Sequence, residues 1–140
     1  MFFREWLNKY EPAMSSTKKI VLVVDDDKSI SEMIKRLLKY YDSSLFVEIV
    51  HDGTAAIQKT NELLPNLITL DINIPGSNGY EVCKTIKTNE KTKHIPIIVI
   101  SGEEDKDAKS KMLSLGADGF LPKPFDINNF LNIIPILLKK

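Results

Sequence analysis

The sequence predicts an α/β fold in which a parallel β-sheet is covered by helices on both of its faces. From Ile20 onward, short apolar runs alternate with segments whose apolar residues recur at helical spacing, and this alternation repeats five times. Two of the runs, IVLVV and IIVI, are entirely apolar, as is typical of strands that are buried on both faces. The chain has 140 residues, of which 43% are hydrophobic, so it can form one domain with a substantial core.

The strands are predicted from five short apolar runs, of which the last is the weakest. They are Ile20–Val24, Leu45–Val50, Leu67–Leu70, Ile97–Ile100 and Gly119–Leu121.

The helices are predicted from the five segments with helical periodicity. They are Ser29–Tyr40, Thr54–Leu64, Gly79–Thr88, Asp105–Leu115 and Ile127–Leu138. Pro65 stops the second of these helices, and Gly116 is a favourable C-terminal cap for the fourth. Pro135 lies inside the last helix and is expected to kink or end it.

The composition argues against several function classes. Nineteen basic residues balance nineteen acidic ones, so there is no bulk attraction to nucleic acids or to membrane surfaces. No apolar run approaches the length of a membrane span. The single cysteine, Cys83, cannot form an internal disulfide, and its helical context indicates a small packing residue. We therefore expect a reducing, cytoplasmic location.

Residues 1–18 precede the alternating pattern and are predicted to be an N-terminal extension and linker. Five apolar residues would share one stripe if this segment were helical: Phe2, Phe3, Trp6, Leu7 and Tyr10. Pro12 and the polar run SSTKK then form the linker. We expect a helix packed on its own domain or a frayed extension. The alternatives are a helix that binds a partner or a membrane surface, and a leader before a second start at Met14.

Polar side chains follow four of the predicted strands at the point where each strand ends. Asp25 and Asp26 follow the first strand, Asp71 follows the third, Ser101 the fourth and Lys123 the fifth. In a parallel sheet these ends share one edge, where ligands bind at the point at which the strand order reverses. Carboxylate oxygens select a hard cation such as Mg²⁺, which would also neutralise the acidic cluster. The pattern predicts a site for in-line phosphoryl transfer to Asp71.

Each of these residues has a plainer interpretation when it is taken alone. An aspartate at a strand end more often caps a helix, and Asp27 is predicted to cap the first one. Ser101 alone would be a turn serine, and Lys123 alone would be a surface lysine. His51 follows the second strand and His94 precedes a proline, so we expect both to be structural or exposed. The joint pattern is what favours a site.

Four segments resemble the receiver domains of two-component response regulators, including the chemotaxis-type regulators that consist of one domain. They are VLVVDDD, LITLDINIPGSNGYEV, IPIIVISGEED and GADGFLPKPF. The resemblance extends from about Lys19 to Leu138 and implies a receiver domain over residues 19–140. It also implies a flavodoxin-like, doubly wound (βα)5 three-layer sandwich, with a parallel sheet of order 2-1-3-4-5.

The resemblance implies a role for each matching residue of the acidic cluster. Asp71 matches the aspartate that accepts the phosphoryl group, and Asp25 and Asp26 match the acidic pair that holds Mg²⁺. Asn73, two positions after Asp71, would bind the metal through its backbone carbonyl.

The resemblance also implies how the signal leaves the site. Ser101 matches the hydroxyl that senses the phosphate, and Lys123 matches the lysine of the motif, with a Lys123–Pro124 bond that is often cis in such domains. Phe120 occupies the position of the aromatic switch residue; it has no hydroxyl, so a switch here would work by packing alone. Pro122 is tolerable because the fifth strand is an edge strand in this order.

The predicted function is that of a receiver in a two-component or phosphorelay system. It would take a phosphoryl group from a sensor histidine kinase or phosphotransfer protein and pass the signal to an effector protein. We expect a signalling module that catalyses only its own phosphorylation and dephosphorylation. No output domain fits after Leu138, so DNA binding is not expected in this chain.

Two alternatives stay open. One is a receiver excised from a hybrid histidine kinase or multidomain regulator. The other, more remote, is a Mg²⁺-dependent phosphohydrolase with an aspartyl-phosphate intermediate. Haloacid-dehalogenase-like enzymes carry a second acidic residue two positions after the nucleophile, where this chain has Asn73.

Overall fold

The computed structural model describes residues 18–102 and 106–139, and it contains one parallel sheet of order β2-β1-β3-β4-β5. The strands are β1 (Ile20–Val24), β2 (Phe46–Val50), β3 (Leu67–Leu70), β4 (Ile97–Ser101) and β5 (Gly119–Pro122). The predicted strands and their order are confirmed, and the ends differ from the prediction by one residue at most.

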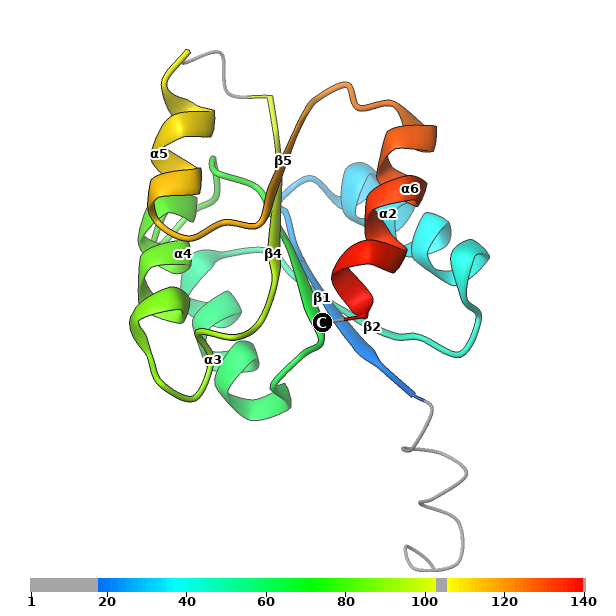
Figure 1. The fold of residues 1–140 in the computed structure, drawn as a ribbon, viewed down its shortest axis with the longest axis horizontal. Coiled ribbons are helices and arrows are strands. Elements are labelled where there is room, and N and C mark those ends of the chain that lie inside the picture. The colour runs from blue at the N-terminus through cyan, green and yellow to red at the C-terminus, as the bar shows by residue number, and fades with distance from the viewer. Residues whose placement is uncertain (1–17, 103–105, 140) are drawn as a thin grey trace, which may run out of the picture.

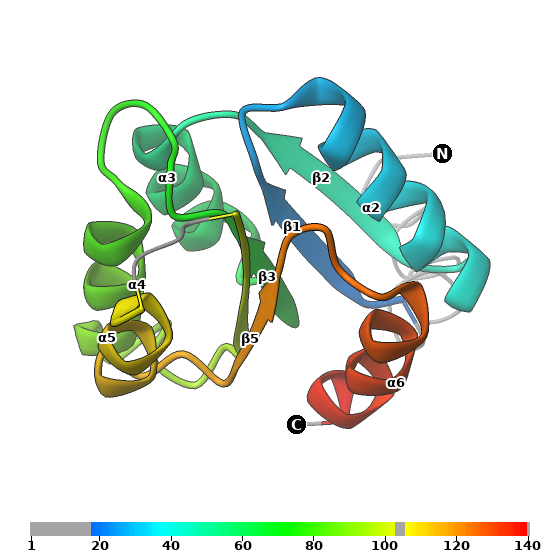
Figure 2. The same cartoon turned by 90° about the horizontal axis from the view of Figure 1, so that it is seen from above.

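Helices cover both faces of this sheet, as Figures 1 and 2 show. Two helices, α2 (Lys28–Tyr41) and α6 (Ile127–Leu138), pack on one face. On the other face lie α3 (Gly53–Leu63), α4 (Gly79–Thr88) and α5 (Ala108–Ser114). The flavodoxin-like three-layer sandwich is therefore confirmed.

The core consists of two apolar clusters separated by the sheet. In β1, Leu22 and Val24 belong to the cluster under α3, α4 and α5, whereas Val21 and Val23 belong to the cluster under α2 and α6. Successive side chains of a strand point to opposite faces, so a strand that is covered on both sides must be apolar throughout. This is why β1 and β4 read as continuous apolar runs.

A side-chain cap places α2 directly after the acidic cluster. Asp27 accepts hydrogen bonds from the backbone N–H groups of Ser29 and Ile30, as predicted for an N-cap. The helix α2 therefore begins at Lys28, three residues after Asp25, and the cap fixes the end of the loop between β1 and α2.

One helix begins later than predicted, and Pro135 does not have the helix-ending effect that was one of its two expected effects. The helix α5 begins at Ala108 in the structure, and the predicted start at Asp105 lies outside the described residues, as does the predicted N-terminal stripe of residues 1–17. The helix α6 has the predicted bounds and continues through Pro135 to Leu138, so Pro135 does not end it; the alternative expectation of a kink stays a prediction. Buried Ile134 and Leu137 hold this last turn against the core despite the missing N–H. None of the described helices is long and apolar enough to span a bilayer.

Candidate functional site

Three carboxylates meet at one edge of the sheet. Asp25 follows β1 and Asp71 follows β3, and these neighbouring strands are paired Val24 to Leu70, so both aspartates lie at the same level. One ligand oxygen from each of Asp25, Asp26 and Asp71 lies within 4.8 Å of the others. Asp25 is only 2% exposed and Asp71 is also buried, whereas Asp26 is open to solvent. This donor set, made of oxygen alone and of one charge sign, fits a hard divalent cation.

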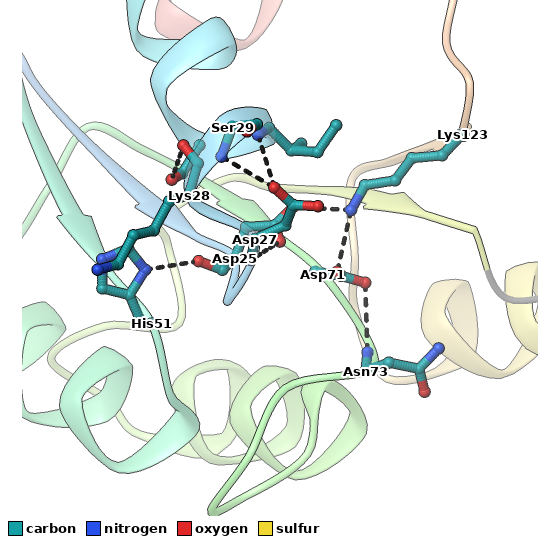
Figure 3. Close-up of polar contacts among 10 residues, drawn as sticks. Asp25, Asp27, Lys28, Ser29, His51, Asp71, Asn73 and Lys123 are labelled. Carbon is teal, nitrogen blue, oxygen red and sulfur yellow. Dashed lines mark hydrogen bonds and ion pairs between the residues drawn. The ribbon is translucent and has the colours of Figure 1, made fainter.

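Lys123 reaches into this cluster from the end of β5. Its Nζ lies 2.7 Å from Oδ2 of Asp25 and 3.0 Å from Oδ2 of Asp71 (Figure 3). Burial raises the pKa of the Asp25 carboxyl, and the hydrogen bond from Lys123 offsets only part of this effect. Burial by itself lowers the pKa of Lys123, but its hydrogen bonds to Asp25 and Asp71 outweigh that effect and raise it. The lysine therefore stays charged, and one ammonium faces three carboxylates.

Both buried carboxylates are oriented by their own loops. Oδ1 of Asp25 accepts a hydrogen bond from the N–H of Asp27 at 2.9 Å, and Oδ1 of Asp71 accepts one from the N–H of Asn73 at 3.2 Å. Each aspartate thus uses one oxygen for its loop and the other for Lys123. The side chain of Asn73 is exposed, and the predicted binding of metal by its carbonyl group stays a prediction.

The structure brings Ser101 and Lys123 to the same edge. Ser101 is the last residue of β4 and is buried, and the backbone N–H of Lys123 donates to its carbonyl oxygen at 2.9 Å. The Lys123–Pro124 bond is cis, as expected, and Pro122 lies on an edge strand. Phe120 pairs with Val99 and packs, partly buried, against the core under α3, α4 and α5. The predicted switch roles of Ser101 and Phe120 stay predictions.

One residue at the site was not recognised from the sequence. His51 is exposed, as predicted, but its Nδ1 lies 2.9 Å from the carbonyl oxygen of Asp25 (Figure 3). The predicted strand order could have indicated this contact, because β2 lies beside β1 and the residue that follows β2 must therefore lie near Asp25. His94 is exposed in the segment between α4 and β4.

Known proteins resemble this chain in sequence and in fold. The family model of the response regulator receiver domain matches residues 21–135. Response regulator MprA of Mycobacterium ulcerans (strain Agy99) is 32% identical over 120 residues, which cover 86% of this chain and 50% of MprA. The chain thus spans about half the length of the curated relatives it matches.

Two solved structures extend the comparison to the fold. The chemotaxis response regulator CheY4 of Vibrio cholerae matches with a TM-score of 0.77 and 30% identity, over 86% of this chain and 99% of CheY4. The Mn²⁺-bound form of response regulator Rcp1 matches with a TM-score of 0.72 and 29% identity, over 83% of this chain and 88% of Rcp1.

The family match runs from β1 into α6 and includes every strand end that contributes to the site. It spans far more than half of the chain, and the strand order and the acidic cluster agree with it. The chain belongs to the family of response regulator receiver domains.

Proposed function

We propose that this chain accepts a phosphoryl group on Asp71, in a Mg²⁺-dependent reaction, from the phosphohistidine of a sensor histidine kinase or a phosphotransfer protein. The observation that carries this proposal is the meeting of Asp25, Asp26 and Asp71 within 4.8 Å, with Lys123 bonded to two of them. Membership of the receiver family supports the same reaction.

The residues of the site have separate tasks in this reaction. A carboxylate oxygen of Asp71 attacks phosphorus, a P–O bond forms, and the P–N bond to the donor imidazole breaks with its electron pair left on nitrogen. The product is an acyl phosphate. Lys123 and Ser101 donate hydrogen bonds to the phosphoryl oxygens. Bound Mg²⁺, held by Asp25, Asp26, Asp71 and the Asn73 carbonyl, would neutralise charge on those oxygens.

The proposed protein is a signalling module that catalyses only its own phosphorylation and dephosphorylation, acting in the cytoplasm. The buried, unpaired Cys83 is consistent with a reducing compartment. Asn73 argues against the phosphohydrolase alternative, because its amide stands where those enzymes carry a second carboxylate. A receiver that forms part of a longer regulator or hybrid kinase is the second candidate, and the twofold length of the curated relatives favours it.

We further propose that the output runs through Ser101 and Phe120. A phosphoryl group on Asp71 would attract the Ser101 hydroxyl and draw the loop after β4 inward. The space that this movement vacates would let the Phe120 ring change between two packings and alter the face formed by α5, β5 and α6, to which an effector protein binds. Partial burial of Phe120 against the core supports this role, because the ring has apolar contacts on one side and is partly open to solvent.

Incubation with a small phosphodonor and Mg²⁺, followed by intact mass measurement, tests the proposal. We expect one phosphoryl increment that disappears when a chelator replaces Mg²⁺. A chain that gains no increment under these conditions, or gains it equally in chelator, would contradict the proposal.

Hydrogen exchange over α5 and β5 tests the output. Phosphorylation of the parent chain should change the protection of these elements, whereas the Ser101→Ala variant should accept phosphate without that change. The same change of protection in both proteins would contradict the role of Ser101.

A further inference from the structure

The hydrogen-bond ladder between β1 and β2 ends in a side-chain contact. Its last backbone bond runs from the N–H of Asp25 to the carbonyl of Val50, at 3.1 Å. Parallel ladders continue at even spacing, so the next bond would run from the N–H of Asp52 to the carbonyl of Asp25. Within residues 18–102 and 106–139 that bond is not made, because the chain turns at Asp52, the N-cap of α3. The Nδ1 of His51 lies 2.9 Å from the Asp25 carbonyl instead.

The direction of this hydrogen bond follows from its acceptor. A carbonyl oxygen can only accept, so the hydrogen lies on Nδ1 of His51 and the imidazole replaces a backbone donor. The ring is exposed and lies outside both apolar clusters. Its contribution is therefore to the position of the Asp25 carbonyl rather than to the packing of the core.

That carbonyl belongs to the peptide that joins Asp25 to Asp26. The side chain of Asp25 is already held by the N–H of Asp27 and by Lys123. Asp26 differs, because no other residue in the described part of the chain makes a hydrogen bond or ion pair with its exposed carboxylate. The placement of the Asp26 carboxylate near the other two ligands therefore depends on the backbone that precedes it.

We propose that His51 is a positioning residue for the cation site: by holding the Asp25 carbonyl, it fixes the peptide that places the Asp26 carboxylate beside Asp25 and Asp71. This inference rests on the proposed Mg²⁺-dependent function. It assigns His51 no contact with the ion or the phosphoryl group. Replacing groups that orient metal ligands in this way typically weakens metal binding about ten- to hundredfold.

Three variants separate the hydrogen bond from the ring. His51→Phe keeps an aromatic ring without a donor, and His51→Asn keeps a donor nitrogen at a similar distance from the backbone. His94→Phe is the matched control, because it replaces the exposed histidine that lies away from the site. Titration calorimetry with Mg²⁺ on chelator-treated protein should give a dissociation constant about tenfold larger for His51→Phe, and within about twofold of the parent for the other two variants.

Thermal unfolding in chelator completes the test, and the parent and His51→Phe should unfold at the same temperature. Parent-like Mg²⁺ affinity in His51→Phe overturns the inference, and so does His51→Asn binding as weakly as His51→Phe. A lower unfolding temperature of His51→Phe with unchanged Mg²⁺ affinity would assign His51 a structural role only. A parent chain that binds no Mg²⁺ contradicts the proposed function itself, which distinguishes the two failures.

Discussion

Two partly buried lysines join distant segments of this domain, and they differ in the charge that surrounds them. The side chain of Lys87, on α4, is 11% exposed and lies 2.9 Å from Oδ2 of Asp118. Its Nζ also donates to the carbonyl groups of Lys93 and Ile95, at 3.3 and 2.7 Å. The side chain of Lys123 is 19% exposed, and its Nζ contacts the carboxylates of Asp25 and Asp71.

The Lys87 cluster is balanced. Among the described residues, the ammonium of Lys87 pairs with the carboxylate of Asp118, whose Oδ2 also accepts the N–H of Ile97 at 2.8 Å. The cluster joins α4, the segment before β4 and the residue that precedes β5, so it stabilises the fold. In the Lys123 cluster one ammonium lies beside the carboxylates of Asp25, Asp26 and Asp71. The cluster therefore has a net negative charge, which a bound cation would neutralise. Burial of a lysine alone does not distinguish the two; the local charge balance does.

Replacement of the nucleophile should have the largest effect. Asp71→Asn should abolish the phosphoryl increment in the intact mass, because an amide cannot form the acyl phosphate. The free energy of unfolding should not fall, since the substitution removes one of three like charges and the amide oxygen can still accept from Lys123. Stoichiometric, Mg²⁺-dependent labelling of this variant at another residue would rule out the assignment of Asp71.

Asp118→Asn is the matched control for that variant, because it removes the carboxylate of the balanced cluster. It should retain phosphorylation but lose about 2 kcal/mol of unfolding free energy, as expected when a hydrogen bond between charged groups is weakened. If it lost phosphorylation as Asp71→Asn does, the two clusters would not be functionally distinct.

Removal of either lysine should have the next largest effect. In chelator, Lys123→Met should lower the free energy of unfolding by about 3 kcal/mol, because the buried carboxylates of Asp25 and Asp71 are left without their partner. Lys87→Met should lower it by about 1 kcal/mol, because Asp118 is more exposed and still accepts the N–H of Ile97. Denaturant unfolding measures both values. A loss below about 0.5 kcal/mol for Lys87→Met would mean that its ion pair behaves as an exposed one, and the comparison would fail.

Added Mg²⁺ should separate the two lysine variants. At a free Mg²⁺ concentration of ten times the dissociation constant of the parent, Mg²⁺ should add about 1.4 kcal/mol to the unfolding free energy of the parent and of Lys87→Met. The gain should be larger for Lys123→Met, because the ammonium no longer competes with the ion for Asp25 and Asp71. Equal gains in the three proteins, measured by denaturant unfolding at one and the same free Mg²⁺ concentration, would show that Lys123 and the ion do not share these ligands.

The strands and the strand ends were predictable because they depend on local sequence. A strand covered on both faces must be apolar, and the polar residues that follow β1, β3, β4 and β5 stand out by their position. This sufficed to predict Asp25, Asp71, Ser101 and Lys123 as neighbours.

Contacts between segments that are distant in sequence were not predictable in the same way. The pair of Lys87 and Asp118 joins residues that are 31 positions apart, and nothing in the local sequence of either residue indicates the other. The contact of His51 depends on where a turn interrupts the ladder between β1 and β2. The end of α6 at Leu138 was predicted, but Pro135 does not end the helix, because burial of the last turn outweighs the loss of one backbone hydrogen bond.

The smallest predicted effect concerns Cys83, which lies one turn before Lys87 on α4 and is 0% exposed. Burial raises the pKa of this thiol from 9.0 to about 11. The charge of Lys87 lowers this pKa and the charge of Asp118 raises it, so the two charges of the pair oppose each other. Because the folded-state pKa exceeds the unfolded value, the thiol's contribution to stability is present below pH 9 and is lost as the pH rises toward 11.

Between pH 8 and pH 10 this thiol should therefore remove about 1 kcal/mol from the free energy of unfolding of the parent. Other groups, the lysines among them, also titrate in this range, so the informative quantity is the difference in pH slope between the parent and Cys83→Ala. Denaturant unfolding at both pH values measures it. The parent should lose more stability than the variant, whose absolute stability is lower because of the cavity. Equal slopes would mean that Cys83 ionises as readily in the folded protein as in the unfolded chain, and that burial beside the balanced lysine cluster does not protect the thiol.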